Sequence, residues 1–263
     1  MTHLIHQELT GSIIGAYYEV YNHTSRTYPE YIYERAMQEE LRRRALSASR
    51  QDQYQITYKD KLIGLQRLDL FVVREIAVEL KVAERLTKLH KAQTVSYLKT
   101  VDKPIGLLLN FGGSQPEFNR LYFNPAKKPG DSTTPPSDLS PDWLYPELCY
   151  QIVGGLYEVH ATLGAGYVHR IYAKACYHEL QLRGLEVKAN KRLQVAYKDV
   201  IVGDIAFKHI QVENKVMVFP VAISAMQDIN RENLKQWLRL SGFQLGIVAN
   251  FDAVYLQVMY LKT

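Results

Sequence analysis

The sequence predicts two tandem α/β domains, each with a mixed central sheet flanked by helices. The first observation behind this prediction is a pattern of residues that occurs twice, about 139 positions apart. The second is a segment rich in Pro, Ser and Thr, residues 125–141, which is typical of an extended linker. We therefore place one domain at 1–124 and the other at 142–263, and each, at roughly 120 residues, is long enough to bury its own core.

The two copies match in a nearly fixed register. Tyr58-Lys59-Asp60 recurs 139 positions on as Tyr197-Lys198-Asp199, and Asn110-Phe111 recurs 140 positions on as Asn250-Phe251. Two long copies indicate two domains of one fold rather than a solenoid, which needs at least about three short repeats.

Two helices are expected at the start of each copy. In the first copy, apolar residues at helical spacing predict helices over 4–21 and 30–46. These apolar positions are Leu9, Ile13, Ala16, Tyr17 and Val20 in the first helix, and Ile32, Tyr33, Ala36, Met37 and Leu41 in the second.

Strands and a third helix follow. Alternating or β-rich runs predict strands, and the return of helical spacing predicts a helix after the third strand. The expected strands are 54–58, 62–73, 76–82, 105–111 and 118–123, with the helix at 85–99. The order α-α-β-β-β-α-β-β is that of an α/β sandwich around a mixed sheet.

Composition sets broad limits. The chain is 47% hydrophobic and 22% charged, and its net charge of +5 permits nucleic-acid binding without requiring it. Cys149 and Cys176 lack the number and spacing of a zinc or iron–sulfur site, so we expect reduced thiols in a cytoplasmic protein. Neither a signal peptide nor an apolar run of membrane-spanning length is visible, so no membrane partner is expected.

A candidate metal site lies around a hairpin of the first copy. Glu79 and Lys81 share one face of a strand because side chains alternate. If the turn centres on Arg74, Asp69 lies opposite Glu79, with Cβ atoms about 5 Å apart. A two-residue turn would put the two acids on opposite faces, so this hypothesis requires an odd loop or a bulge. Two carboxylates that close repel unless a cation lies between them.

Further groups would surround this site. Carboxylates, a backbone carbonyl and water suit Mg²⁺ or Mn²⁺. Lys81 could orient or deprotonate the attacking water and offset phosphate charge. Gln93 and Tyr97, four residues apart, share one helix face, and Glu30, at the start of the second helix, is a further candidate carboxylate. Each feature alone is more typical of a solvated surface or a helix terminus.

Together these residues resemble a known family. The first copy is similar, over 4–112, to the GxxExxY proteins, a branch of the PD-(D/E)XK nuclease superfamily. Asp69 matches the motif acid, Glu79-Leu80-Lys81 matches ExK, and Gln93-Thr94-Val95-Ser96-Tyr97 matches the QxxxY of RecB-type nucleases. RecB-type relatives with a four-cysteine cluster are excluded as a guide by the two cysteines.

The resemblance implies a restriction-endonuclease-like fold in both copies and a metal-dependent phosphodiesterase. It would place Asp69, Glu79 and the Leu80 carbonyl on the ion, with Lys81 beside the water. The naming motif is split between the copies. The first copy keeps the Glu and Tyr at 27–33 but lacks the Gly, and the second keeps the Gly and Tyr at 166–172 but lacks the Glu.

The second copy is expected to be a pseudo-nuclease. In place of Asp69, Glu79, Lys81, Gln93 and Tyr97 we expect Lys208, Val218, Pro220, Asn233 and Trp237. This set cannot hold a divalent cation. Pro220 suggests a strand edge or a bulge. His169 and His209 lack the carboxylate or thiol cluster of a metal site, so we favour polar contacts for them.

Basic clusters in both copies are candidates for phosphate contacts without base readout, although ordinary solvated faces look the same. They are Arg42, Arg43 and Arg44 in the first copy, and Lys188, Lys191, Arg192 and Lys208 in the second. The function expected is a Mg²⁺- or Mn²⁺-dependent nuclease acting on DNA or RNA with one N-terminal active site. The alternatives are a non-catalytic nucleic-acid-binding or scaffold protein and a protein-interacting regulator. The internal pair is compatible with a monomer.

Overall fold

The computed structural model describes residues 6–124 and 144–263, apart from the side chains of 190, 191, 193–196 and 205–207. The expected linker, 125–141, lies outside the described residues. The described chain divides into two compact units. The first contains 6–57 and 64–124, and the second contains 58–63 and 144–263.

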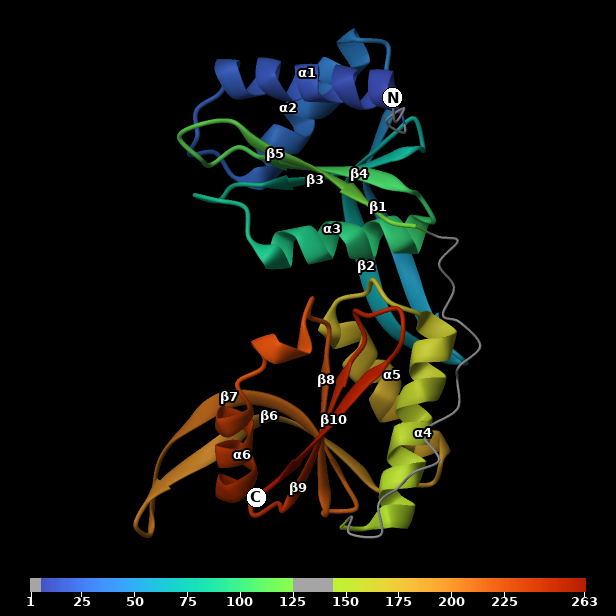
Figure 1. Ribbon diagram of the computed structural model, residues 1–263. Helices are drawn as coiled ribbons and strands as arrows, with labels where there is room; N and C mark the ends of the chain where they lie inside the picture. Colours follow the sequence, from blue (N-terminus) through green and yellow to red (C-terminus); the bar gives the residue numbers. More distant parts are fainter. Residues whose placement is uncertain (1–5, 125–143) are drawn as a thin grey trace. The chain divides into compact units, whose positions relative to one another are not determined.

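The first copy has the expected order of elements (Figure 1). They are α1 (Gln7–His23), α2 (Glu30–Arg43), β1 (Ala48–Tyr58), β2 (Lys61–Val72), β3 (Ile76–Lys81), α3 (Lys88–Val101), β4 (Ile105–Asn110) and β5 (Glu117–Tyr122). The strand β1 starts earlier than expected. Its first residues are mostly polar and do not alternate with apolar ones, so the sequence pattern did not indicate them as part of a strand.

The sheet of the first copy is mixed, with strand order β1-β2-β3-β4-β5. β3 pairs parallel with β4, while β2–β3 and β4–β5 are antiparallel. Leu70, Val78 and Leu80 join residues of α1 and α2 in one core cluster. Phe71 and Ala77 join residues of α3 in another. Helices therefore pack on both faces of this sheet, as an α/β sandwich requires.

The second copy repeats this architecture. Its elements are α4 (Pro146–Leu163), α5 (His169–Leu182), β6 (Val187–Tyr197), β7 (Val200–Val212), β8 (Val216–Val221), the 3₁₀ helix η1 (Met226–Asp228), α6 (Arg231–Leu240), β9 (Leu245–Asn250) and β10 (Gln257–Lys262). The strand order is β10-β9-β8-β7-β6, again with one parallel pair, β8–β9. Cys149 and Cys176 are buried free thiols. No helix among the described residues is long and apolar enough to cross a membrane.

The register of the duplication changes inside β7. This strand has 13 residues where β2 has 12, and its pairing with β6 shifts between Asn190 and Arg192 and between Val195 and Ala196. Beyond the shift, equivalent residues are 140 apart, because Ile210 pairs with Val218 as Leu70 pairs with Val78.

The sequence-based counterparts of the metal-site residues are therefore wrong by one position. His209, Phe219 and Val221, rather than Lys208, Val218 and Pro220, stand where the first copy has Asp69, Glu79 and Lys81. A shift of one residue moves every strand side chain to the other face. The corrected set still contains no carboxylate.

Pro220 is not at a sheet edge, contrary to expectation, because β8 is the central strand. It lies beyond the last β7–β8 pair of the described strands, Ile210–Val218, so its missing N–H interrupts none of the pairs with β7. Its counterpart in the first copy is Leu80.

Candidate metal centre

The β2–β3 hairpin has the odd-numbered connection that the metal-site hypothesis requires. Val72 pairs with Ile76, which leaves three residues in the loop. Val73 and Arg74 adopt positive φ angles of 52° and 56°, and the Glu75 N–H donates to the Val72 carbonyl at 2.9 Å. Continued by one residue, this register sets Asp69 against Glu79 on one face.

Asp69 and Glu79 are buried just beyond the last β2–β3 pair, with 7% and 2% of their surface exposed. Asp69 Oδ2 accepts a hydrogen bond of 2.8 Å from the Leu80 N–H. Burial, with the nearby charge of Asp69, holds the pKa of Glu79 well above its ordinary value. No hydrogen-bond partner of Glu79 Oε2 is found in the part of the chain that the structure describes.

Lys81 is the positive charge beside these acids. Its Nζ lies 2.6 Å from Glu79 Oε1, 2.8 Å from the Leu80 carbonyl oxygen and 3.6 Å from Glu30 Oε2. Burial lowers the pKa of Lys81, but the neighbouring acids, Glu79 foremost with Glu30 and Asp69, together outweigh burial and raise it. Lys81 therefore serves here as a protonated hydrogen-bond donor.

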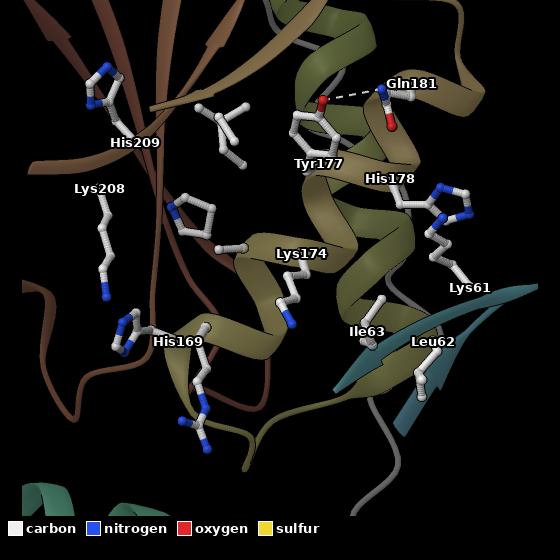
Figure 2. A pocket seen from close by; sticks show the side chains of 15 residues that line it. Lys61, Leu62, Ile63, His169, Lys174, Tyr177, His178, Gln181, Lys208 and His209 are labelled. Atoms are coloured by element: carbon white, nitrogen blue, oxygen red, sulfur yellow. Dashed lines mark hydrogen bonds between the residues drawn. The ribbon is translucent and has the colours of Figure 1, made fainter. Parts of the chain in front are cut away.

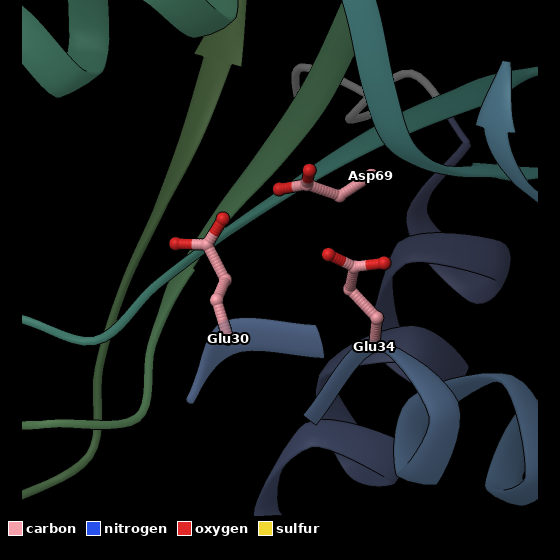
Figure 3. Close-up of side chains that lie close together, drawn as sticks. All are labelled: Glu30, Glu34 and Asp69. Carbon is pink, nitrogen blue, oxygen red and sulfur yellow. The ribbon is translucent and has the colours of Figure 1, made fainter. Parts of the chain in front are cut away.

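The helix α2 contributes two more acids. Oxygen atoms of Glu30, Glu34 and Asp69 all lie within 4.8 Å of one another (Figure 3). Burial raises the pKa of Glu30. Glu34 Oε2 also lies 3.7 Å from Arg50 Nε. Sequence reasoning selected Glu30 but missed Glu34. The signal available was the four-residue spacing, which puts both acids on one helix face.

Gln51 is a second residue that sequence reasoning missed. Its Nε2 lies 3.5 Å from Asp69 Oδ1, and its buried Oε1 has no hydrogen-bond partner within 6–124 and 144–263. Buried oxygen acceptors without partners cost free energy. Glu79 Oε2 and Gln51 Oε1 are both such acceptors, and both residues are neighbours of the Asp69 carboxylate. A cation bound here would give these oxygen atoms a partner.

Gln93 and Tyr97 of α3 contact each other, with Gln93 Nε2 donating to the Tyr97 hydroxyl at 2.5 Å. Burial raises the Tyr97 pKa to about 12, and the charges of Glu79 and Asp69 add to the effect. Strands β2 and β3 and helix α2 therefore bring Asp69, Glu79, Lys81 and Glu30 together, and the charge of Glu79 acts on Tyr97 of α3. The donor set is entirely oxygen, which suits a hard divalent cation.

A family model of the PD-(D/E)XK nuclease superfamily matches residues 7–121 and again residues 146–261. The chain belongs to the PD-(D/E)XK nuclease superfamily. A search of curated proteins and a search of solved structures each returned no match. The paired match agrees with a PD-(D/E)XK fold present twice, and nucleases of this superfamily typically use divalent metal ions.

The second PD-(D/E)XK copy has no acid at the positions that correspond to the centre. Besides the three changes in β7 and β8, His169 replaces Glu30 and Ala173 replaces Glu34 at the start of α5. A cavity of about 580 Å³ lies here, and Figure 2 shows Lys208 extending toward His169 at its wall. Burial and the charges of Lys208 and Arg170 lower the His169 pKa.

This cavity is strongly basic. Lys174, Arg170 and Lys208 line it, and among its described lining residues there is no Asp or Glu. A concave wall of one charge sign attracts counter-ions. The charge sign is thus inverted between the two copies at the same place in the fold.

The other predicted basic residues have acidic neighbours within the chain. Arg42 and Arg43 pair with Glu39, and Arg44 pairs with Glu40. In the second copy, Lys188 pairs with Glu186 and Arg192 pairs with Asp204, while the side chain of Lys191 lies outside the described residues. Such exposed pairs are weak and can be exchanged for phosphates.

Proposed function

We propose that the first copy is the single active site of a Mg²⁺- or Mn²⁺-dependent nuclease and that the second copy is a pseudo-nuclease. The observation that carries this proposal is the cluster of Glu30 with the buried acids Glu34, Asp69 and Glu79, where two buried oxygen acceptors have no partner among the described residues. Superfamily membership makes a phosphodiester the fitting substrate. The split motif and the ExK and QxxxY residues support the GxxExxY branch.

Each group of the centre has a proposed task. Asp69, Glu79 and the Leu80 carbonyl would hold the ion, with Glu30 and Glu34 within reach of it. The ion would polarise a phosphoryl oxygen and lower the pKa of a water molecule. Lys81 donates hydrogen bonds to the water and to the phosphate, and its positive charge offsets that of the substrate. Gln93 and Tyr97, which are hydrogen-bonded to each other on α3, would form one side of the site.

The second copy would hold the nucleic-acid backbone. Its basic cavity, together with Lys188, Lys191 and Arg192, supplies cations that suit phosphates. We propose DNA or RNA as the partner and the cytoplasm as the location.

The alternative is a non-catalytic nucleic-acid-binding or scaffold protein. One observation favours it: Lys81 Nζ already contacts both Glu79 Oε1 and the Leu80 carbonyl, two of the proposed ligand atoms. In that case the buried lysine would replace the ion rather than assist it.

The experiment that decides is degradation of labelled DNA and RNA by the full chain with Mg²⁺, Mn²⁺ or EDTA. The variants are Asp69→Asn and Lys81→Ala, and the matched control is Lys215→Ala, an exposed lysine in the β7–β8 turn. We expect metal-dependent cleavage by the wild type and by Lys215→Ala, and no cleavage by Asp69→Asn or Lys81→Ala. No cutting with either metal would favour the alternative, and cutting by both variants at the wild-type rate would refute the site.

A further inference from the structure

The tip of the β1–β2 hairpin, Tyr58–Ile63, belongs to the second compact unit and is bound there by specific contacts. The Tyr58 hydroxyl donates to Glu179 Oε2 at 2.8 Å, and Lys59 Nζ lies 2.6 Å from the same oxygen. Lys59 Nζ also lies 3.9 Å from Glu158 Oε1. Tyr58 is fully buried. The first two residues of the tip thus bind a pair of acids from α4 and α5.

Two further contacts complete this seat. His178 Nε2 lies 3.0 Å from Asp60 Oδ1. Arg183 Nε donates to Glu179 Oε1 at 2.9 Å, which holds the Glu179 carboxylate in place. Ile63 at the end of the tip is 1% exposed. We call the residues Glu158, His178, Glu179 and Arg183 the α4–α5 seat.

The same tip in the second copy has no such seat among the residues that the structure describes. Tyr197-Lys198-Asp199 repeats Tyr58-Lys59-Asp60 residue for residue, but Tyr197 is 66% exposed. The apolar residues after it, Val200, Ile201 and Val202, are 65%, 60% and 61% exposed. An exposed apolar strand end is a hazard unless it has a partner.

The first copy repeats the seat on α1 and α2. Glu19 stands 139 positions before Glu158, and Glu40 stands 139 positions before Glu179. Arg44 Nε donates to Glu40 Oε1 at 2.8 Å, as Arg183 does to Glu179. We call Glu19, Glu40 and Arg44 the α1–α2 seat. Among the described residues Glu40 has that single side-chain partner, whereas Glu179 has three.

The two seats differ at the position of His178, but basic groups are present at both. Glu39 stands where α5 has His178, and it is bound to Arg42 and Arg43. Two guanidinium groups are therefore present near the place where the acid of the tip, Asp199, would arrive. Charge complementarity between tip and seat is retained.

We propose that the β6–β7 tip of one chain docks on the α1–α2 seat of a second copy of this chain. The Tyr197 hydroxyl donates to Glu40, Lys198 pairs with Glu40 and Glu19, and Val202 is covered as Ile63 is. Tip and seat are different surfaces, so the contact is head-to-tail. A single hairpin tip buries little area, so the association is weak and concentration-dependent.

The test is sedimentation equilibrium of the full chain at concentrations up to about 200 µM, where contacts with Kd values between micromolar and millimolar populate. We expect self-association that Tyr197→Ser weakens at least about tenfold, as removal of an interface aromatic does. Lys198→Glu should abolish it, and Lys215→Glu, the matched charge change in the β7–β8 turn, should leave it unchanged.

A charge exchange gives the decisive readout. Lys198→Glu and Glu40→Lys should each be monomeric alone and should associate when mixed, because tip and seat carry opposite charges in every contact between the two variants. Circular dichroism melting of each variant checks its folding, and Glu19→Lys replaces Glu40→Lys if the latter does not fold. A wild-type chain that stays monomeric over the whole concentration range, or variants that associate as wild type does, would overturn the proposal.

Discussion

The backbone N–H of Leu80 donates to Asp69 Oδ2 at 2.8 Å and so ties the motif acid to the strand that carries Glu79 and Lys81. In the second copy the two positions are Pro220 and His209, which offer neither the N–H nor the carboxylate. The second copy has therefore lost both partners of this bond. Asp69 has a structural task as well as the proposed chemical one.

Asp69→Asn should separate these two tasks. The amide oxygen of Asn still accepts from Leu80, so we expect the free energy of unfolding to change by no more than about 1 kcal/mol. Cleavage should fall at least about a hundredfold, since a metal ligand's charge is lost. Urea unfolding and a metal-dependent cleavage assay measure the two quantities. A stable variant of wild-type activity would remove Asp69 from the site.

Divalent ions should stabilise the folded chain. Binding to the native state alone adds about 2.7 kcal/mol at an ion concentration one hundred times Kd, and the repulsion among Glu30, Glu34 and Asp69 is relieved. The measurement is thermal unfolding with and without Mg²⁺ or Mn²⁺. Glu34→Gln should reduce the rise in Tm, while Glu39→Gln, on the same helix but paired with arginines, should not. Equal rises in all three proteins would place the ion elsewhere.

The basic cavity of the second copy should bind nucleic acid through phosphates. Replacing Lys208 or Arg170 by Glu should weaken binding of any sequence and lower the slope of log K against log salt by about 0.9 for each lost contact. Fluorescence anisotropy at several salt concentrations measures this slope. Arg239→Glu, at an exposed position at the end of α6, is the control. An unchanged slope in Lys208→Glu and Arg170→Glu would exclude the cavity as a contact surface.

Replacing Val73 in the β2–β3 turn by Asn should stabilise the folded chain. A β-branched residue at a φ of 52° is strained, whereas Asn adopts this conformation readily. Val73→Asn should raise the free energy of unfolding by about 1 kcal/mol. The isosteric Val73→Thr stays β-branched and should give no gain in the same urea titration. A loss of stability in Val73→Asn would mean that the Val73 side chain contributes more than its backbone costs.

The sequence by itself determined the element order, the duplication and the face shared by Glu79 and Lys81. These features depend on local periodicity and on repeated residues, which a single chain displays. The requirement for an odd β2–β3 loop also followed from alternation along strands, although nothing local indicated whether the loop was odd.

Only the tertiary structure decided which other groups meet at the site. Glu34 and Gln51 reach Asp69 because α2 and β1 pack beside the end of the β2–β3 ladder, and no periodicity records such a meeting. Because β7 has an extra residue, the residues at an offset of 139, Lys208 and Val218, lie on the other strand face from the true counterparts of the acids, His209 and Phe219. Matching residues in the sequence does not show where in the strand such an extra residue lies. Burial separated the two Tyr-Lys-Asp tips, identical in sequence, because only Tyr58 is covered and Tyr197 is not.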